Sequence, residues 1–394
     1  MPFAFRHQPF KTLYFFGVAL SFLFVKLPFW TVRYLVPAWR PVREWSLSRM
    51  LLVKSLGVLF TTMFDTSIDS LKCDPEKEGP PDEVGLVWIE PKQELVVGEI
   101  KSAAQVNNIH PIKVAGFWYG KRGENGQVGQ AAGPDEKVIY ELHGGGFVLG
   151  SAGPKGGSAY FCSEALKYAP HYTRVFQVEY RLSQGPPLEP SGAFPAALID
   201  AMLGYDYLVN TVGFKPSNIM IAGESAGGHL ALALARYIVH ASIPSLTIPG
   251  ALMLHSPTVD WGNTHRGPKS SMHTHANSDF VHNFLSGYPT RSLVGSLPQS
   301  DAYLNAWISP ASLRLEHSEG LFAGLPPTLI LAGAVEMTLD PMKTLADRME
   351  ADMGKDLVTY VEIENATHAV LLAKWHEPER THAYEVFASW AKKF

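Results

Sequence analysis

Cysteine is nearly absent from this sequence of 394 residues, which contains only Cys73 and Cys162. Two cysteines are too few for a disulfide framework, and neither lies at the spacing of a metal-binding motif. We therefore expect both to be structural thiols. Their number leaves the redox compartment open.

Runs of lysine and arginine are also lacking, and the net charge is −4. Proteins that bind nucleic acid usually present a basic patch, so we expect no nucleic-acid partner. Internal repeats and low-complexity tracts are absent as well. What is present, 46% hydrophobic and 18% charged residues, is the ordinary composition of a globular enzyme.

The N-terminal region lacks an uninterrupted membrane span. Residues 13–25 (LYFFGVALSFLFV) carry no charge, but Lys26 follows, and the apolar stretch that continues to Trp39 includes Arg33. A full span needs about 20 apolar residues. No small residues follow Val25, so a signal-peptide cleavage site is not expected there.

Three interpretations of this segment stay open. The first is an uncleaved signal anchor whose Lys26 reaches the headgroups. The second is an interfacial helix with Trp30, Tyr34 and Trp39 at headgroup level. The third is a cap helix that is buried on the body. We expect membrane association through residues 13–39. A spanning topology is not decided, because positive charges flank both sides.

Beyond residue 45 the apolar residues recur at helical spacing, which predicts an amphipathic helix with one buried face. Its apolar positions are Leu47, Leu51, Leu52, Leu56, Leu59, Phe60 and Met63. A charged segment closed by proline, residues 72–81, then marks a boundary. We predict a membrane-associating segment at 1–40, N-terminal cap helices at 41–82 and a catalytic domain at 83–394.

The body alternates strand and helix patterns. Eight β-type runs are predicted at 84–90, 112–119, 137–142, 174–180, 218–222, 251–255, 328–332 and 358–363, with helices at 158–168, 195–212, 226–240 and 341–353. This order predicts an α/β fold with an eight-stranded, mostly parallel sheet flanked by helices. The strand-free interval 257–326 is predicted to be a partly helical cap insertion after the sixth strand.

Gly-Glu-Ser225-Ala-Gly-Gly follows the fifth predicted strand and opens an apolar helix. G-x-S-x-G alone occurs by chance, but between a strand and a helix its glycines permit the sharp turn that exposes a nucleophilic serine. The N-terminus of the helix also favours developing negative charge. We therefore predict that Ser225 is a nucleophile, and the alternative is a glycine-rich helix cap.

HGGGF at residues 143–147 directly follows the third predicted strand. Consecutive glycines let backbone N–H groups point at an oxygen atom without interference from a Cβ. Such donors stabilise the tetrahedral oxyanion of acyl transfer. Alone, this motif could be a flexible loop or a phosphate cradle, but together with Ser225 it indicates serine hydrolase chemistry.

The general base should follow the nucleophile in this chain order. His368, in NATHAV, comes just after the last predicted strand and therefore at the carboxyl edge of the sheet. The histidines that crowd the region after the sixth strand are predicted to be cap or surface residues: His255, His265, His273, His275 and His282. The close pair His273 and His275 could suggest a metal, but no carboxylate spacing supports one, so no metal is expected.

Two candidates for the acid follow the seventh predicted strand. Asp340 precedes Pro341 at the start of a helical pattern, which explains it as an N-cap with proline at N1. Glu336 lies in the loop near the strand end, where it could orient the imidazole and stabilise its cation. Glu336 is therefore the preferred acid.

Together these residues resemble the hormone-sensitive-lipase-like group of α/β hydrolases, especially fungal esterases with a hydrophobic N-terminal segment and relatives of the arylacetamide-deacetylase and steryl-acetyl-hydrolase type. The resemblance extends from about residue 84 to the C-terminus. It rests on HGGGF at 143–147, EYRLS at 179–183, FPAALIDA at 194–201, GESAGG at 223–228 and THAV at 367–370. It implies an α/β-hydrolase fold capped by N-terminal helices and by the insertion after the sixth strand.

Carried onto this chain, the resemblance implies an oxyanion hole formed by Gly145, Gly146 and Ala226. The acid motif of the group, D-P-L-x-D, places its first and catalytic aspartate at Glu336 and its second at Asp340. The usual His-Gly-Phe after the base reads His-Ala-Val here, which is expected to reshape the pocket wall.

The expected activity is the hydrolysis of small hydrophobic esters, such as acetylated sterols, lipids or secondary metabolites. The reaction passes through an acyl-enzyme on Ser225 and needs no metal or organic cofactor. Two alternatives stay open: acyl transfer through the same acyl-enzyme, and a catalytically silent binding module on this fold. The residues do not indicate an oligomeric state.

The sequon Asn365-Ala-Thr367 stands beside His368, where a glycan would crowd the mouth of the active site. Either the body faces the cytosol, or it faces the lumen and the sequon is not glycosylated. We expect a location on the endoplasmic reticulum or another endomembrane, with the body on the cytosolic face.

Overall fold

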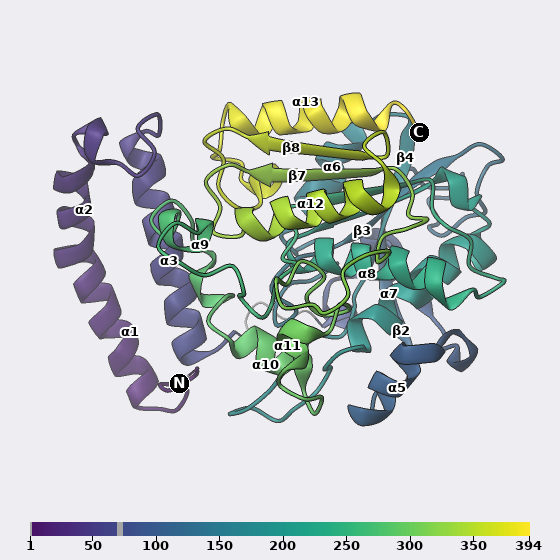
Figure 1. The fold of residues 1–394 in the computed structure, drawn as a ribbon, viewed down its shortest axis with the longest axis horizontal. Helices are drawn as coiled ribbons and strands as arrows, with labels where there is room; N and C mark the ends of the chain where they lie inside the picture. The colour runs from purple at the N-terminus through teal and green to yellow at the C-terminus, as the bar shows by residue number, and fades with distance from the viewer. Residues whose placement is uncertain (1, 69–73) are drawn as a thin grey trace.

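A computed structural model describes residues 2–68 and 74–394 and centres on one eight-stranded sheet (Figure 1). The strands are β1 (Leu86–Ile89), β2 (Val114–Gly120), β3 (Lys137–Leu142), β4 (Tyr172–Val178), β5 (Ile219–Glu224), β6 (Ala251–His255), β7 (Thr328–Gly333) and β8 (Val358–Ile363). Their order is β1-β2-β4-β3-β5-β6-β7-β8. β2 pairs antiparallel with β1 and β4, and the other neighbours pair parallel, so the predicted fold class is confirmed.

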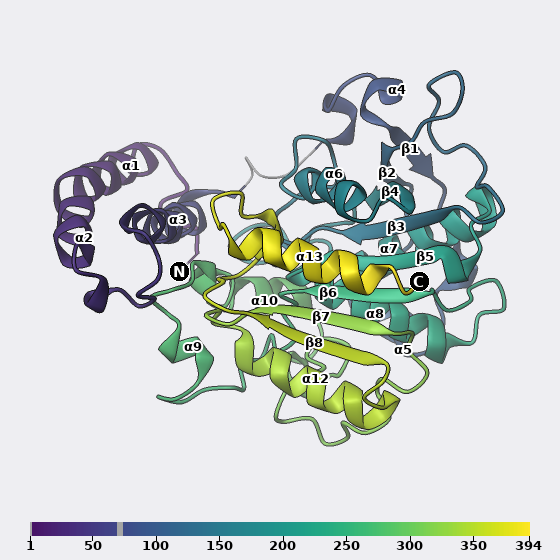
Figure 2. The ribbon, with the colours of Figure 1, turned by 90° about the horizontal axis from the view of Figure 1, so that it is seen from above.

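Helices cover both faces of this sheet (Figure 2). In the body they are α4 (Pro81–Val84), α5 (Gly98–Val106), α6 (Ala159–Tyr168), α7 (Ala196–Asp206), α8 (Ala226–Ala241), α9 (Ser271–Thr274), α10 (Tyr288–Val294), α11 (Asp301–Leu304), α12 (Leu339–Met353) and α13 (Glu379–Ala391). Ile139 and Met220 belong to the core shared with α6 and α13, whereas their neighbours Val138 and Ile221 belong to the core shared with α7 and α8. Successive strand residues thus face opposite layers, as in a doubly wound sheet.

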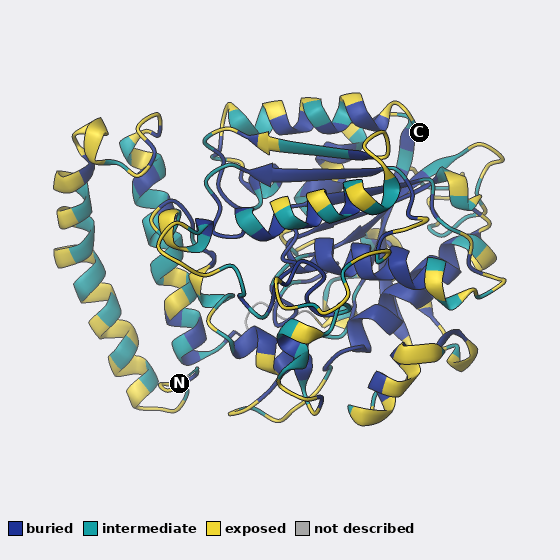
Figure 3. Cartoon of the chain, in the orientation of Figure 1, coloured by how far each residue is buried: buried dark blue, intermediate teal, exposed yellow. Residues whose placement is uncertain are grey.

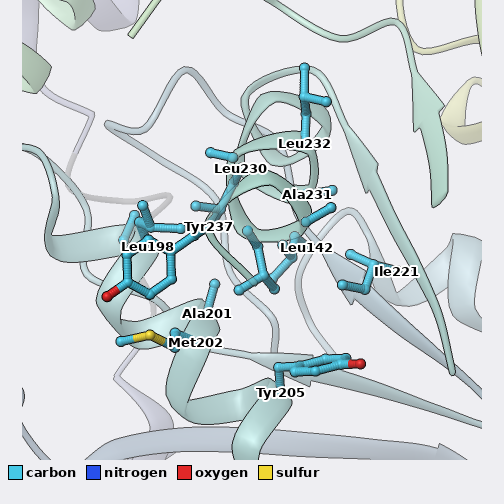
Figure 4. Packing of buried hydrophobic residues seen from close by; sticks show 14 of the residues in the cluster. Leu142, Leu198, Ala201, Met202, Tyr205, Ile221, Leu230, Ala231, Leu232 and Tyr237 are labelled. Carbon is cyan, nitrogen blue, oxygen red and sulfur yellow. The ribbon is translucent and has the colours of Figure 1, made fainter. Parts of the chain in front are cut away.

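The larger core lies between the sheet and the helices α7 and α8. α7 is buried along its whole length, and almost all of α8 is buried. Figure 4 shows Leu142 and Ile221 from the strands beside Ala201 of α7 and Leu230 of α8. This packing explains why the central strands are apolar without alternation, because every residue of β5 and β6 is buried.

Several predicted boundaries differ from the structure. β3, β6 and β8 begin and end as predicted, but β4 begins two residues earlier, where Tyr172 pairs with Lys137. α5 and α13 were not predicted, although the buried residues of α13 recur at helical spacing: Ala383, Tyr384, Phe387, Trp390 and Ala391. The interval predicted as a cap insertion contains α9, α10 and α11 and no strand among its residues, all of which are described.

The N-terminal helices stand beside the body (Figures 1 and 2). α1 (Phe10–Ser21), a π-helical segment (Phe22–Lys26) and α2 (Leu27–Tyr34) form one continuous helix, so Lys26 does not interrupt it. α3 (Leu47–Thr66) contacts both α1 and α2. Phe10–Tyr34 and Leu47–Thr66 are both long and apolar enough to cross a membrane.

The prediction of a single buried face on α3 is wrong. Its buried apolar residues are Met50, Val53 and Phe64, whereas Leu59 of the predicted face is 51% exposed. The reason is that α3 lies between two partners, α2 on one side and the segment Val281–Asn283 of the insertion on the other. The proposed division of the chain at residues 40 and 82 stays a prediction.

Candidate active site

Ser225 stands at a sharp turn between β5 and α8. Its backbone adopts φ 55° and ψ −116°, a conformation that is strained for a residue with a side chain. Its N–H donates to the carbonyl of His255, 2.9 Å away. The turn packs so closely on β3 that a Cβ on Gly227 would lie 1.9 Å from the Leu142 carbonyl oxygen. The sequence therefore forms the predicted turn because glycine stands where the backbones meet.

The Ser225 hydroxyl is hydrogen-bonded to the hydroxyl of Thr258, with 3.2 Å between the oxygens. His368 Nε2 lies 3.4 Å from Glu224 Oε1. Among the described residues no hydrogen bond joins Ser225 to His368, but both side chains line one cavity. Such bonds are often long or unformed until substrate binds.

Glu336 contacts the other ring nitrogen of His368, with 2.8 Å between Oε2 and Nδ1. Glu336 is fully buried and sits in the tight turn after β7. Its Oε1 accepts hydrogen bonds from the Ser256 hydroxyl at 2.7 Å and from the Gly333 N–H. Burial would raise the pKa of Glu336, but His368 and these donors outweigh burial and lower it, so the carboxylate is ionised.

Asp340 takes no part in this cluster. Its Oδ2 accepts from the Ser271 N–H at 2.8 Å, which ties α12 to α9. The prediction that it caps α12 is wrong, because the helix begins at Leu339 after Thr338, and Asp340 lies inside the first turn. A carboxylate there is still favourable to the helix dipole.

His368 lies among several titratable groups. Burial opposes its protonation, but the carboxylates of Glu336, Glu224 and Asp279 prevail and raise the pKa of His368 well above its ordinary value. Asp279 is held by the backbone N–H groups of Phe280 and Met337. The site can therefore stabilise a positive imidazolium.

The HGGGF loop lines the cavity opposite His368. Gly145 has φ +114°, and a Cβ there would lie 2.1 Å from the Leu149 carbonyl oxygen, so only glycine fits. In the described part of the chain, the N–H groups of Gly145 and Gly146 have no hydrogen-bond acceptor. Ala226 is fully buried at the first position of α8. Tyr180 braces the loop by donating to the His143 carbonyl at 2.6 Å.

The cavity has a volume of about 500 Å³. Its apolar lining comes from the body, α3 and the insertion: Phe60, Leu149, Phe280, Val281, Phe284 and Leu372. Glu78 and Lys155 line its polar side. Ala369, at the position of the glycine in the usual His-Gly-Phe, also lines it and adopts φ +58°.

Sequence reasoning missed four polar neighbours of the site: Glu224, Ser256, Thr258 and Asp279. Ser256 directly follows β6, so the rule that functional side chains gather at the carboxyl ends of parallel strands could have found it. Asp279 comes from the insertion and carries no local signal.

His255 is not a cap or surface histidine as predicted. It is the buried last residue of β6, and burial lowers its pKa to about 3. The Leu371 N–H approaches its Nε2 at 3.4 Å, so the neutral ring supports the loop behind His368. The other four histidines of the group do lie in the insertion.

Within residues 2–68 and 74–394, no group of three or more His, Cys, Asp or Glu side chains could hold a metal ion. Cys162 is buried, and Gln177 donates to its Sγ, as expected of a structural thiol. Cys73 lies outside the described residues.

Known proteins share this sequence pattern and this fold. Residues 139–372 match the family described as the α/β hydrolase fold. An esterase from Acinetobacter venetianus is 30% identical over 258 residues, 65% of this chain and 74% of that protein. An acetyl-hydrolase from Streptomyces hygroscopicus is 31% identical over 260 residues, 64% of this chain and 74% of that protein. A solved esterase/lipase from an uncultured bacterium superposes with a TM-score of 0.56 at 23% identity, covering 93% of this chain and 96% of that one.

The family match begins in β3 and ends after His368, so it includes the glycine loop, Ser225 and Glu336. It covers more than half of the chain. A hormone-sensitive lipase from a metagenome library has the same fold, with a TM-score of 0.54 at 24% identity over 71% of this chain and 80% of that one. The chain belongs to the α/β-hydrolase family.

Proposed function

We propose that this protein hydrolyses carboxylic esters, with Ser225 as the nucleophile, His368 as the general base and Glu336 as the acid that orients the imidazole. The observation that carries the proposal is the 2.8 Å contact between Glu336 and His368 Nδ1, whose ring lines one cavity with Ser225. The names of the relatives, esterase and acetyl-hydrolase, support it.

In the proposed reaction, the Ser225 hydroxyl turns toward His368 Nε2, loses its proton to it and forms a bond to the ester carbonyl carbon. The N–H groups of Gly145, Gly146 and Ala226 receive the oxyanion. The C–O bond then breaks, and the alcohol leaves with the proton from His368. Water attacks the acyl-enzyme by the same steps and releases the acid. No metal or organic cofactor takes part.

Serine reactivity tests this assignment. A fluorophosphonate probe should label the wild type at Ser225, and S225A should lose both labelling and the hydrolysis of p-nitrophenyl acetate. Full activity in S225A would overturn the proposal. Acyl transfer is distinguished by the products formed when an alcohol competes with water, and a silent binding module by the absence of any labelling.

We also propose a hydrophobic ester as the substrate. The aromatic and aliphatic lining of the cavity supports this choice, since apolar groups gain by leaving water. A series of p-nitrophenyl esters from acetyl to long acyl chains, with and without detergent, should show kcat/KM rising beyond acetyl. A steady fall with chain length would contradict it.

We further propose that the helix Phe10–Tyr34 lies in the interface of an endomembrane. Large apolar side chains are exposed along it, including Phe10, Phe16, Leu20, Phe24, Phe29 and Val32, and Phe24 is 73% exposed (Figure 3). Contiguous apolar surface of this kind marks a membrane or partner contact.

The attachment of this helix favours an interfacial over a spanning position. Tyr14, near its start, bonds to Asp65 at the end of α3. At its other end Arg40 donates to the carbonyls of Tyr34, at 2.8 Å, and Trp45, at 2.6 Å. The helix therefore runs antiparallel to α3 along the flank of the body, which supports the interfacial position.

Vesicle flotation and labelling test this arrangement. F24D in combination with F16D should abolish flotation with phosphatidylcholine vesicles, whereas L313D, at an exposed leucine of the insertion, should not. Single cysteines at positions 7 and 39, in a background lacking Cys73, should both react with an impermeant maleimide from outside sealed microsomes. If only one of the two cysteines reacts, the helix spans the membrane. If neither cysteine reacts, the body lies in the lumen.

A further inference from the structure

A second cavity of about 230 Å³ lies between the N-terminal helices and the insertion. Tyr14, Val18 and Trp30 of the first helix line it, together with Gly57 and Val58 of α3. In Figures 1 and 2 the helix pair α1–α2 lies side by side with α3, and the segment Val281–Asn283 of the insertion contacts α3. This cavity thus lies directly under the helix that we place in the membrane interface.

Phe280 lines this second cavity and the catalytic cavity as well. Its ring stacks on Phe60 of α3, with 5.9 Å between centroids and 19° between planes. On the other side it meets the His368 imidazole edge-on at 6.4 Å. A single layer of aromatic side chains therefore separates the second cavity from the catalytic histidine.

Polar contacts between α3 and the insertion border the second cavity. Lys54 Nζ donates to Asn277 Oδ1 at 2.8 Å, and Asn283 Nδ2 donates to Thr61 Oγ1 at 2.9 Å. These contacts keep α3 and the insertion apart at a fixed distance on either side of Phe280.

We propose that this second cavity is the entrance through which an ester dissolved in a lipid bilayer reaches Ser225. The proposal rests on the proposed esterase function. The apolar part of the substrate passes between the first helix and α3, displaces Phe280 and brings its carbonyl to the serine. Water-soluble esters use the polar side of the catalytic cavity, beside Glu78 and Lys155. Polar residues, among them Lys54 and His282, also line the cavity, but a route through the protein spares the apolar part of the substrate from bulk water. That transfer costs about 25 cal/mol per Å² of apolar surface.

G57F tests the entrance because a side chain at this position would fill the cavity. A Cβ on Gly57 meets nothing within 4 Å, and replacing a helical glycine does not weaken the helix. We expect kcat/KM for p-nitrophenyl palmitate in phosphatidylcholine vesicles to fall about tenfold while hydrolysis of p-nitrophenyl acetate in water is retained. G17F is the matched control, since Gly17 of α1 is equally open but does not line the cavity.

For the substitution F280A we expect the opposite effect on palmitate hydrolysis. Removing the aromatic layer should raise kcat/KM for the vesicle-borne palmitate relative to acetate. Unchanged palmitate hydrolysis in G57F, equal loss of both substrates in G57F, or a lower palmitate-to-acetate ratio in F280A would each overturn the entrance. Vesicle flotation of each variant checks that binding is intact. If the wild type fails to hydrolyse p-nitrophenyl acetate, the proposed function has failed rather than the entrance.

Discussion

The carboxylate of Glu336 is buried yet surrounded by donors. His368, the hydroxyls of Ser256 and Thr338 and the Gly333 N–H all contact it. A buried charge is stable only when its partners replace the water that it has lost. The ends of β6 and β7 and the loops after β7 and β8 supply these partners, which is why this residue rather than Asp340 can hold a negative charge against the imidazole.

E336Q should lower kcat on p-nitrophenyl acetate by roughly 10³-fold or more, because an amide holds the imidazole poorly and cannot stabilise its cation. D340N is the control and should leave kcat close to that of the wild type, since Asp340 bonds to the Ser271 N–H outside the site. Steady-state kinetics of both variants decide between the two acids. The reverse pattern would make Asp340 the acid.

The pH dependence of kcat/KM should show the effect of Glu224 on the pKa of His368. His368 is faced by Glu224 from β5, neutral His255 from β6, Asp279 from the insertion and Glu336 after β7. E224Q removes one negative charge beside Nε2, so the imidazolium is less stable and the pKa of His368 falls.

Because neutral imidazole is the base, the acidic limb of kcat/KM in E224Q should move to lower pH. The measurement is kcat/KM for p-nitrophenyl acetate against pH in both proteins. An acidic limb that stays in place or moves to higher pH would contradict the assignment.

Ala369 carries backbone strain where the family usually has glycine. Its φ of +58° disfavours any residue with a Cβ. A369G should therefore raise the free energy of unfolding by up to about 1 kcal/mol. This gain is the strain energy that glycine relieves, reduced by the larger conformational entropy that glycine gives to the unfolded chain. Urea unfolding measures the change, and destabilisation would mean that contacts of the Cβ outweigh the strain.

At the scale of elements, α3 joins the N-terminal unit to the body. Trp45, just before it, is fully buried and donates from Nε1 to the Asn365 carbonyl at 2.7 Å. Within the first turn, Arg49 pairs with Glu379 of α13 at 2.9 Å. At the other end Phe64 meets Tyr288 of α10 edge-on. α3 is thereby fixed to the body at both ends and can form a wall of the catalytic cavity.

W45A should destabilise the protein by about 3–5 kcal/mol, as expected when a buried tryptophan is truncated. W39A is the matched control, because Trp39 is 57% exposed and its loss should change stability by no more than about 0.5 kcal/mol. Urea unfolding in detergent solution compares the two. Equal effects would contradict the attachment of α3 through Trp45.

At the scale of the whole molecule, the topology assembles the site. β5, β6 and β7 are parallel neighbours, so Ser225, Ser256 and Glu336 emerge beside one another at one edge of the sheet. β8 extends this edge, and the loop after it brings His368. Residues more than 100 positions apart meet because the parallel strands β3 to β8 all end at the same edge.

Much of this arrangement could be predicted locally. Ser225 and His368 are marked by the strands before them, and the continuous apolar runs of β5 to β7 predict a buried parallel sheet. The choice of Glu336 over Asp340 followed from the distance of each residue to the strand end. These features depend on residues close in the chain, which is why periodicity and motif spacing were sufficient.

Other features needed the folded chain. The insertion has no periodic pattern, so nothing local placed Asp279 beside His368 or Phe280 against Phe60 of α3. The contact surfaces of α3 also needed the folded chain, because the helix packs on α2 and on Val281–Asn283, and the single apolar face predicted from its spacing does not describe these contacts. The sequence by itself determined the candidate nucleophile, the candidate base and the sheet, since these follow from local pattern. Only the tertiary structure decided how the cap packs on the body and which residues line the cavity, because those depend on contacts between segments hundreds of residues apart.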